Sequence, residues 1–223
     1  MNLAETVMEY CERTGPGLFA EPLNACSNAA FLYAAWRLWQ RAAGAPTAMA
    51  APQRLLAALI ALVGVASLCF HTFATRWAGI LDVACIGIFN LTYLFVFLRR
   101  LAAWQSAAAL AATVMFVVAD RSAGLILPEE ALNGSVLYLP ALTALLALTV
   151  YAWRLAPAAG RVMTGAGAVF LVSLTARTLD PLVCSVWPWG THFLWHLLNA
   201  WVLYRLSRAL VTAQAEPDAA RAN

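Results

Sequence analysis

The sequence contains no lysine and few charged residues of any kind. Charged side chains make up 11% of the 223 residues, whereas a soluble domain has about 25%. This scarcity excludes an ordinary cytosolic domain, and the 63% of hydrophobic residues excludes a disordered chain. Without lysine the chain cannot hold retinal as a Schiff base, and its scattered arginines form no basic patch for nucleic acid.

Long apolar stretches, in contrast, are abundant. Seven of them approach the ~20 residues with which a helix crosses a bilayer, at 23–39, 55–73, 78–98, 102–119, 135–153, 162–175 and 191–209. They are rich in Leu and Ala and do not alternate as the strands of a membrane barrel do. We therefore predict an all-α polytopic membrane protein with a seven-transmembrane-helix bundle over residues 23–210. Residues 211–223 are expected to be a disordered cytoplasmic tail.

The distribution of arginine predicts how the bundle is oriented. With the N-terminus outside and the distal Arg221 left out, nine arginines fall on the inner side and four on the outer side, as the positive-inside rule requires. Residues 1–22 then form an extracytoplasmic segment with four glutamates, which is not expected to be a signal peptide. The Ala- and Arg-rich composition favours a bacterial inner membrane, and the pattern predicts no oligomeric state.

All three histidines fall at one predicted depth near the outer face. His71 lies near the outer end of the second stretch, on the same helical face as Ser67. His192 and His196 begin the last stretch with the i, i+4 spacing that lets two imidazoles bind one metal ion. Asp82 begins the third stretch at the same depth. We therefore predict a zinc site of three histidines, whose open fourth position is typical of catalysis.

Simpler interpretations exist for each of these signals taken alone. A single buried histidine is usually a hydrogen-bonded core residue, and Asp82 can be a counter-charge to Arg76 or Arg177. A haem held by two histidines would leave the third histidine and Asp82 without a role. A transporter is disfavoured because no internal repeat is found and the inner halves of the helices hold no ionisable residue.

The N-terminal segment carries a second group of polar side chains. Glu9, Glu12, Thr14 and Glu21 surround a Gly-Pro-Gly turn. Hard oxygen ligands on a turn suit calcium. The alternative is an acidic loop that is simply solvated. The sequence alone therefore predicts either a calcium loop or a surface loop here.

Two further features connect this segment to the helices. A polar stripe at helical spacing is expected to face the bundle interior rather than lipid, and it consists of Glu21, Asn24, Ser27 and Asn28. Cys11 and Cys184 fall on the same predicted outer side, where an oxidising compartment allows them to pair. Two free thiols are the alternative.

Taken together, these motifs resemble the alkaline ceramidase family of seven-helix membrane hydrolases, which is related to the adiponectin-receptor-like proteins. The similarity runs from about Glu9 to Leu203. It rests on Tyr-Cys-Glu at 10–12, Ala-Glu-Pro-Leu-Asn-Ala-Cys-Ser-Asn at 20–28, Ser-x-x-x-His at 67–71, Asp82, and His-x-x-x-His at 192–196. The chain departs from the family's usual pattern at Glu9, Tyr10 and Thr14, and its turn before Glu21 is shorter.

The resemblance implies roles for individual residues. Zinc is held by His71, His192 and His196, Asp82 transfers protons and Ser67 stabilises the oxyanion. A disulfide joins Cys11 to Cys184. Calcium is held by Glu9, the Tyr10 carbonyl, Glu12, Thr14 and Glu21.

The implied activity is hydrolysis of the amide bond of ceramide-like lipids within the bilayer, which yields a fatty acid and a sphingoid base. Two alternatives stay open. A zinc hydrolase of another lipid amide or ester would need the same site chemistry. A non-catalytic, receptor-like seven-helix protein would use zinc only as a structural ion.

Overall fold

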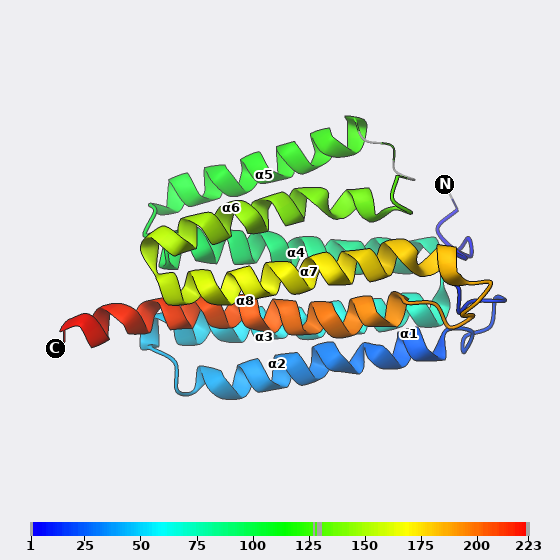
Figure 1. Cartoon of the computed structure of the whole chain (residues 1–223), viewed down its shortest axis with the longest axis horizontal. Coiled ribbons are helices and arrows are strands. Elements are labelled where there is room, and N and C mark those ends of the chain that lie inside the picture. Colours follow the sequence, from blue (N-terminus) through cyan, green and yellow to red (C-terminus); the bar gives the residue numbers. More distant parts are fainter. Residues whose placement is uncertain (1, 127, 129–130, 222–223) are drawn as a thin grey trace.

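Long helices lying side by side make up nearly all of the structure (Figure 1). The computed structural model describes residues 2–126, 128 and 131–221. The elements in chain order are α1 (Pro22–Ser27), α2 (Ala29–Ala42), α3 (Thr47–Phe73), α4 (Arg76–Arg100), α5 (Ser106–Ile126), η1 (Ser135–Tyr138), α6 (Leu139–Leu155), α7 (Pro157–Val183) and α8 (His192–Arg221). Within the described residues there is no strand, and the all-α prediction is confirmed.

In the part of the chain that the structure describes, five segments are long and apolar enough to cross a membrane, namely α3, α4, α5, η1 together with α6, and α7. Large apolar side chains point outward from them, as Val83, Met115 and Val172 do, each with about 60% of its surface exposed. Water disfavours such an exterior, and a soluble protein rarely exposes apolar patches of this extent. Lipid chains suit it, so the helices indicate a membrane protein, as the sequence predicted.

Several helices differ in length from the predicted apolar stretches. α3 begins at Thr47 rather than at 55, and α7 covers Pro157–Val183 rather than 162–175. Polar residues at the helix ends, such as Arg161 and Arg177, end an apolar run without ending the helix. The first stretch is divided at Asn28 into α1 and α2.

The C-terminal segment also differs from the prediction. α8 continues to Arg221, so residues 211–221 are helical instead of disordered. Four of its residues are Ala, which has the highest helix propensity and favours extension of the helix past its apolar part. Residues 222–223 of the predicted tail lie outside the described residues.

The inner layer of the bundle is formed by helices that carry the histidines. α3 packs on α2 and α4, and α8 packs on α7 and α2. Leu38, Ile60 and Leu210 are almost fully buried there. Gly64 lets α2 approach α3 closely, because a Cβ at that position would lie 2.7 Å from Cβ of Phe31. This close packing fixes the position of α3, on which His71 lies.

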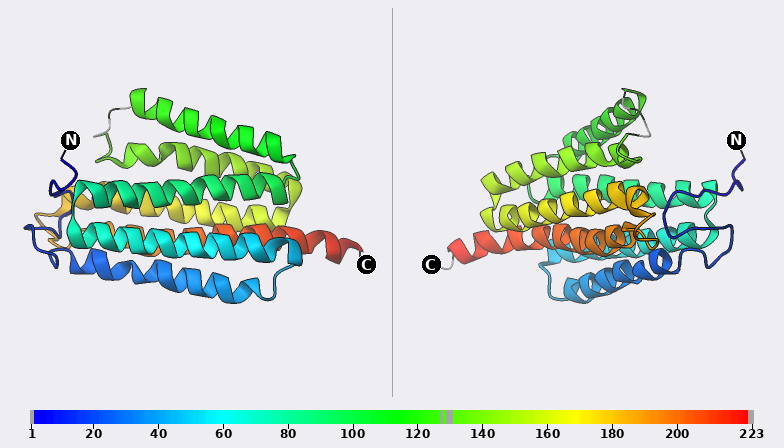
Figure 2. Two further views of the ribbon diagram at one scale, coloured as in Figure 1. Left: turned by 180° about the vertical axis from the view of Figure 1, so that it is seen from behind. Right: turned by 45° about the vertical axis from the view of Figure 1, so that its right-hand side comes forward.

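The two termini lie at opposite ends of the bundle (Figures 1 and 2). The N-terminal segment folds over the end at which α3 stops and both α4 and α8 begin. It is held there by backbone hydrogen bonds, from the Val7 N–H to the Ala74 carbonyl (2.7 Å) and from the Arg76 N–H to the Glu5 carbonyl (3.0 Å). Segments far apart in sequence therefore meet at this end.

Candidate metal centre

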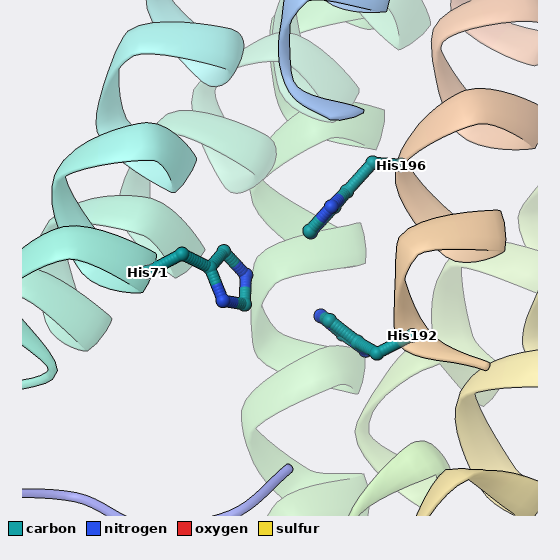
Figure 3. Close-up of side chains that lie close together, drawn as sticks. All are labelled: His71, His192 and His196. Atoms are coloured by element: carbon teal, nitrogen blue, oxygen red, sulfur yellow. The ribbon is translucent and has the colours of Figure 1, made fainter. Parts of the chain in front are cut away.

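Three imidazoles from two helices point into one common space (Figure 3). His71 lies two residues before the end of α3, and His192 and His196 occupy the first two turns of α8. At most 2% of the surface of each is exposed. Their ring centroids are 4.6–5.1 Å apart, and one nitrogen from each ring lies within 4.8 Å of the others. The sequence prediction that these three residues meet is confirmed.

The remaining ring nitrogens show how two of the imidazoles are oriented. Nδ1 of His71 lies 2.6 Å from Oε2 of Glu21, and Nδ1 of His196 lies 2.7 Å from Oγ of Ser27. Nε2 of His71 and Nδ1 of His192 are buried without a hydrogen-bond partner among the described residues. Buried polar atoms are rarely left unpaired. Buried ring nitrogens that have no protein partner fit residues that could bind a metal ion.

The chemistry of this group fits zinc. Two nitrogens that share a zinc ion at bonds of about 2 Å lie at most ~4 Å apart, and the three ring nitrogens here lie within 4.8 Å of one another. Metal-ligating histidines usually donate their second N–H to a carboxylate or another acceptor, as Glu21 and Ser27 provide here. Three histidines leave one zinc position open. The centre is thus compatible with metal binding.

The two predicted catalytic residues lie around the histidines. Ser67 is buried on α3, and its Oγ lies 3.4 Å from Nε2 of His196. Asp82 on α4 is close enough to His71 and Arg177 to interact with both electrostatically. Its Oδ1 is buried and lacks a hydrogen-bond partner in the described part of the chain. Asp82 does not belong to the group that could bind the ion directly, which leaves its carboxylate available for another task.

Asp180, near the end of α7, holds the start of α8 in place. Its Oδ1 accepts hydrogen bonds from the backbone N–H groups of Thr191 (2.6 Å) and His192 (2.8 Å). Its Oδ2 accepts one from the N–H of Cys11 (3.0 Å). Gly190 has a φ of +64°, and a Cβ there would collide with the Asp180 carboxylate. A carboxylate at a helix N-terminus stabilises the helix, and this one also fixes the backbone of His192.

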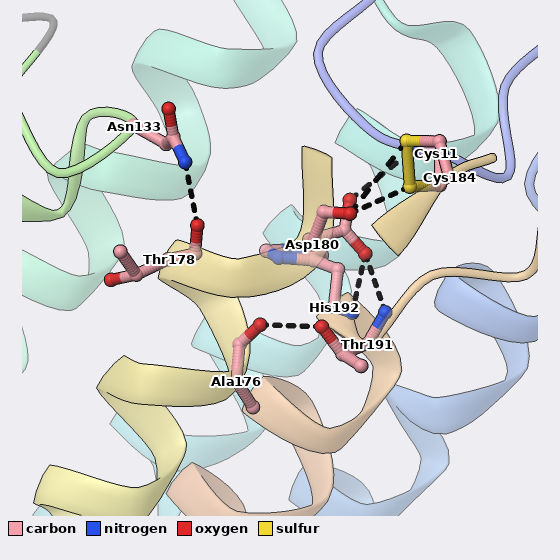
Figure 4. The surroundings of a disulfide bond; sticks show 8 residues. All are labelled: Cys11, Asn133, Ala176, Thr178, Asp180, Cys184, Thr191 and His192. Carbon is pink, nitrogen blue, oxygen red and sulfur yellow. Dashed lines mark hydrogen bonds between the residues drawn. A yellow bond between two sulfur atoms is a disulfide. The ribbon is translucent and has the colours of Figure 1, made fainter. Parts of the chain in front are cut away.

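A disulfide links the same three parts of the chain (Figure 4). Cys11 and Cys184 are bonded across 173 residues, with their Cα atoms 5.0 Å apart. Of the two alternatives that the sequence left open, the disulfide is correct. It ties the N-terminal segment to the connection between α7 and α8, directly beside Asp180.

Loss of this bond is expected to destabilise the protein substantially. A disulfide that closes a long loop typically contributes about 3 kcal/mol, because it restricts the unfolded chain. We expect the double variant Cys11→Ser/Cys184→Ser to unfold at a lower temperature than the parent protein in detergent. Cys26→Ser, which changes an exposed free cysteine, is the control and should unfold like the parent. Equal melting temperatures for all three proteins would contradict the expectation.

The residues predicted to hold calcium differ in burial and in their partners. Glu9 and Thr14 are exposed, while Glu12 and Glu21 are buried. Glu12 accepts hydrogen bonds from the backbone N–H groups of Leu23 and Asn24, and burial raises its pKa against the effect of these bonds. Burial also raises the pKa of Glu21, but hydrogen bonds from His71, Arg13 and Asn24 outweigh it and lower that pKa. Glu21 is therefore a carboxylate that serves the histidine centre.

Two further residues of the N-terminal segment contact the histidine centre, and the sequence did not predict either contact. Arg13, one of the four outer arginines, is buried against Glu21 and the end of α3. The ring of Tyr10 stacks on His192 with centroids 3.7 Å apart. Burial raises the pKa of Tyr10, so its phenol stays neutral. The polar stripe predicted at Glu21, Asn24, Ser27 and Asn28 is buried as expected.

An apolar cavity of about 90 Å³ lies next to the metal centre. Its lining includes Phe31 and Trp195. The ring of Phe31 lies edge-on to that of His196, with the ring centroids 6.4 Å apart. Phe116 of α5 lines this cavity and also a second hollow between α5 and α6. The cavity therefore presents an apolar surface beside the histidines.

Comparison with known proteins adds no assignment. No protein-family model matches the chain, and a search of curated proteins finds no significant relative. A functional proposal therefore depends on the geometry of the site and on the motifs.

Proposed function

We propose that the protein is a zinc-dependent membrane amidase that hydrolyses ceramide-like lipids to a fatty acid and a sphingoid base. The observation that carries the proposal is the group of three buried imidazoles, two of which have their outer nitrogens held by Glu21 and Ser27. The adjoining apolar cavity supports a lipid substrate. The Ser67, Asp82 and histidine motifs support an amidase, because they resemble those of the alkaline ceramidases.

The residues around the centre suit hydrolysis. Bound zinc, held by His71, His192 and His196, would polarise the amide carbonyl and lower the pKa of a water molecule towards ~7. Asp82 has an unpaired buried oxygen, with which it takes the proton of the attacking water and later passes it to the leaving amine. Ser67, next to His196, donates a hydrogen bond to the oxyanion.

The proposed membrane arrangement follows from the same features. α1 with α2, and α8, are the two additional crossings of a seven-helix bundle with the N-terminus outside and the C-terminus inside. The excess of arginine on the inner side supports this orientation. The Cys11–Cys184 disulfide supports an oxidising compartment on the side of the metal centre, which in a bacterial inner membrane is the periplasm.

Metal analysis combined with product analysis tests the proposal. We expect purified protein to contain one zinc ion per chain, and to release a fatty acid and a sphingoid base from ceramides in mixed micelles. N-acyl amino-acid lipids and glycerolipids are compared in the same assay. Turnover confined to those lipids would favour a different zinc hydrolase, and bound zinc without turnover would favour a receptor-like protein. Protein that binds no metal would refute the proposal.

A further inference from the structure

The N-terminal loop contains a buried positive charge, the guanidinium group of Arg13. The Arg13 side chain has 0% of its surface exposed and forms an ion pair with Oε1 of Glu21. Its terminal nitrogens donate hydrogen bonds to three backbone carbonyls, those of Gly15 (3.1 Å), Gly17 (3.2 Å) and His71 (2.9 Å). Carboxylate and carbonyl oxygens are the ligands that calcium prefers. Here they surround a guanidinium group.

The two buried acidic groups of the loop, Glu12 and Glu21, have partners without a metal ion. Oε2 of Glu21, the oxygen not paired with Arg13, contacts Nδ1 of His71 (2.6 Å) and accepts a hydrogen bond from Nδ2 of Asn24 (3.1 Å). Both oxygens of Glu12 accept backbone N–H groups at the start of α1, at 2.6 and 2.8 Å. A calcium ion would have to displace these partners. The two buried carboxylates that suggested calcium in the sequence are therefore already occupied.

We propose that Arg13 takes the place of a divalent cation in this loop and acts as a positioning residue for the metal centre. Arg13 reaches His71 in two ways, through the carboxylate of Glu21 to the imidazole and directly to the backbone carbonyl. It fixes both the ring and the end of the helix that carries it. This part rests on the proposed zinc site, whereas the replacement of calcium does not.

Calcium titration of the parent protein tests whether Arg13 takes the place of a divalent cation. The protein is purified in a chelator, and its melting temperature is followed up to about 5 mM calcium, above the ~10⁻³ M range of the weakest protein sites. We expect no shift, and we expect activity and zinc content to be unchanged by a calcium-selective chelator. A saturable rise in melting temperature with calcium would overturn the proposal.

The variant Arg13→Ala tests whether Arg13 positions the metal centre, with Arg76→Ala as the matched control. Arg76 also joins the N-terminal segment to the bundle, through an exposed ion pair with Glu5. Because residues that support a metal ligand typically change affinity by roughly 10- to 100-fold, we expect Arg13→Ala to weaken zinc binding by that factor. Arg76→Ala should bind zinc like the parent. Equal zinc affinities of the two variants would refute a positioning role.

A calcium response of the variant separates a cation site from a simple structural contact. Removal of the guanidinium leaves four oxygens around an empty space, so we expect calcium to raise the melting temperature of Arg13→Ala but not of Arg76→Ala. No response in either would contradict the replacement of a metal ion by Arg13.

If Arg13→Ala does not fold, Arg13→Lys retains the charge without the planar fork, and the expected result is an intermediate loss of zinc affinity. Parent protein without zinc would refute the proposed function but leave both calcium experiments decisive.

Discussion

Replacement of His196 by alanine is expected to remove the metal and the hydrolytic activity together. His196 is 2% exposed and supplies one of only three nitrogens in the centre. Loss of a supporting residue alone weakens a metal site roughly 10- to 100-fold, and we expect loss of a ligand to exceed that range. Zinc content by mass spectrometry and release of the sphingoid base are the two measurements.

Leu197→Ala is the matched control for this variant. Leu197 follows His196 on α8, and 42% of its side-chain surface faces outward. It should retain one zinc ion per chain and the activity of the parent. If His196→Ala retained stoichiometric zinc and full turnover, the three histidines would be a hydrogen-bonded core group and not a metal site.

The Asp82→Asn variant is expected to lose turnover while it keeps the metal. The amide has the shape of the carboxylate but cannot accept the proton of the attacking water. Removal of a general base typically costs 10²- to 10⁴-fold in rate, roughly speaking. Since Asp82 lies outside the ligand group, zinc affinity should stay within the range of the parent. The measurements are kcat for ceramide hydrolysis and zinc content of the same preparation.

Val83→Ala serves as the control for Asp82→Asn, because Val83 is the next residue on α4 and is 62% exposed. It should match the parent in both measurements. Unchanged kcat in Asp82→Asn would assign Asp82 to charge balance with Arg177, the simpler alternative. Loss of zinc in Asp82→Asn would instead mean that this carboxylate supports the ligands.

The histidine centre could be predicted from sequence because its signal is periodic and directional. The i, i+4 spacing of His192 and His196 sets them on one face, and the alternating direction of successive apolar helices brings His71 to the same end. Neither inference needs knowledge of a contact. The helical class could be predicted for the same reason, since long apolar runs cannot be stable in lipid unless their backbone groups are paired internally.

Other parts of the site depend on long-range contacts that no local sequence pattern predicts. Arg13 lies 58 residues from His71, and Asp180 lies 169 residues from Cys11. From the sequence, Arg13 is one more outer charge, and Glu21 is one of several acidic side chains near a turn. Only the folded chain shows that Arg13 neutralises Glu21 and that Glu21 orients His71. The pairing of charges across the fold is what makes a self-contained loop a testable alternative to a calcium loop.

The covalent link between Cys11 and Cys184 has a consequence for biogenesis. The ribosome synthesises the second cysteine 173 residues after the first, when nearly all of the helices have already been made. Until then the N-terminal segment cannot be bonded to the connection between α7 and α8, and Asp180 cannot hold the start of α8. The group of three histidines is therefore completed only at the end of synthesis, so a nascent chain whose last helix is still unmade cannot hold a metal ion with all three imidazoles.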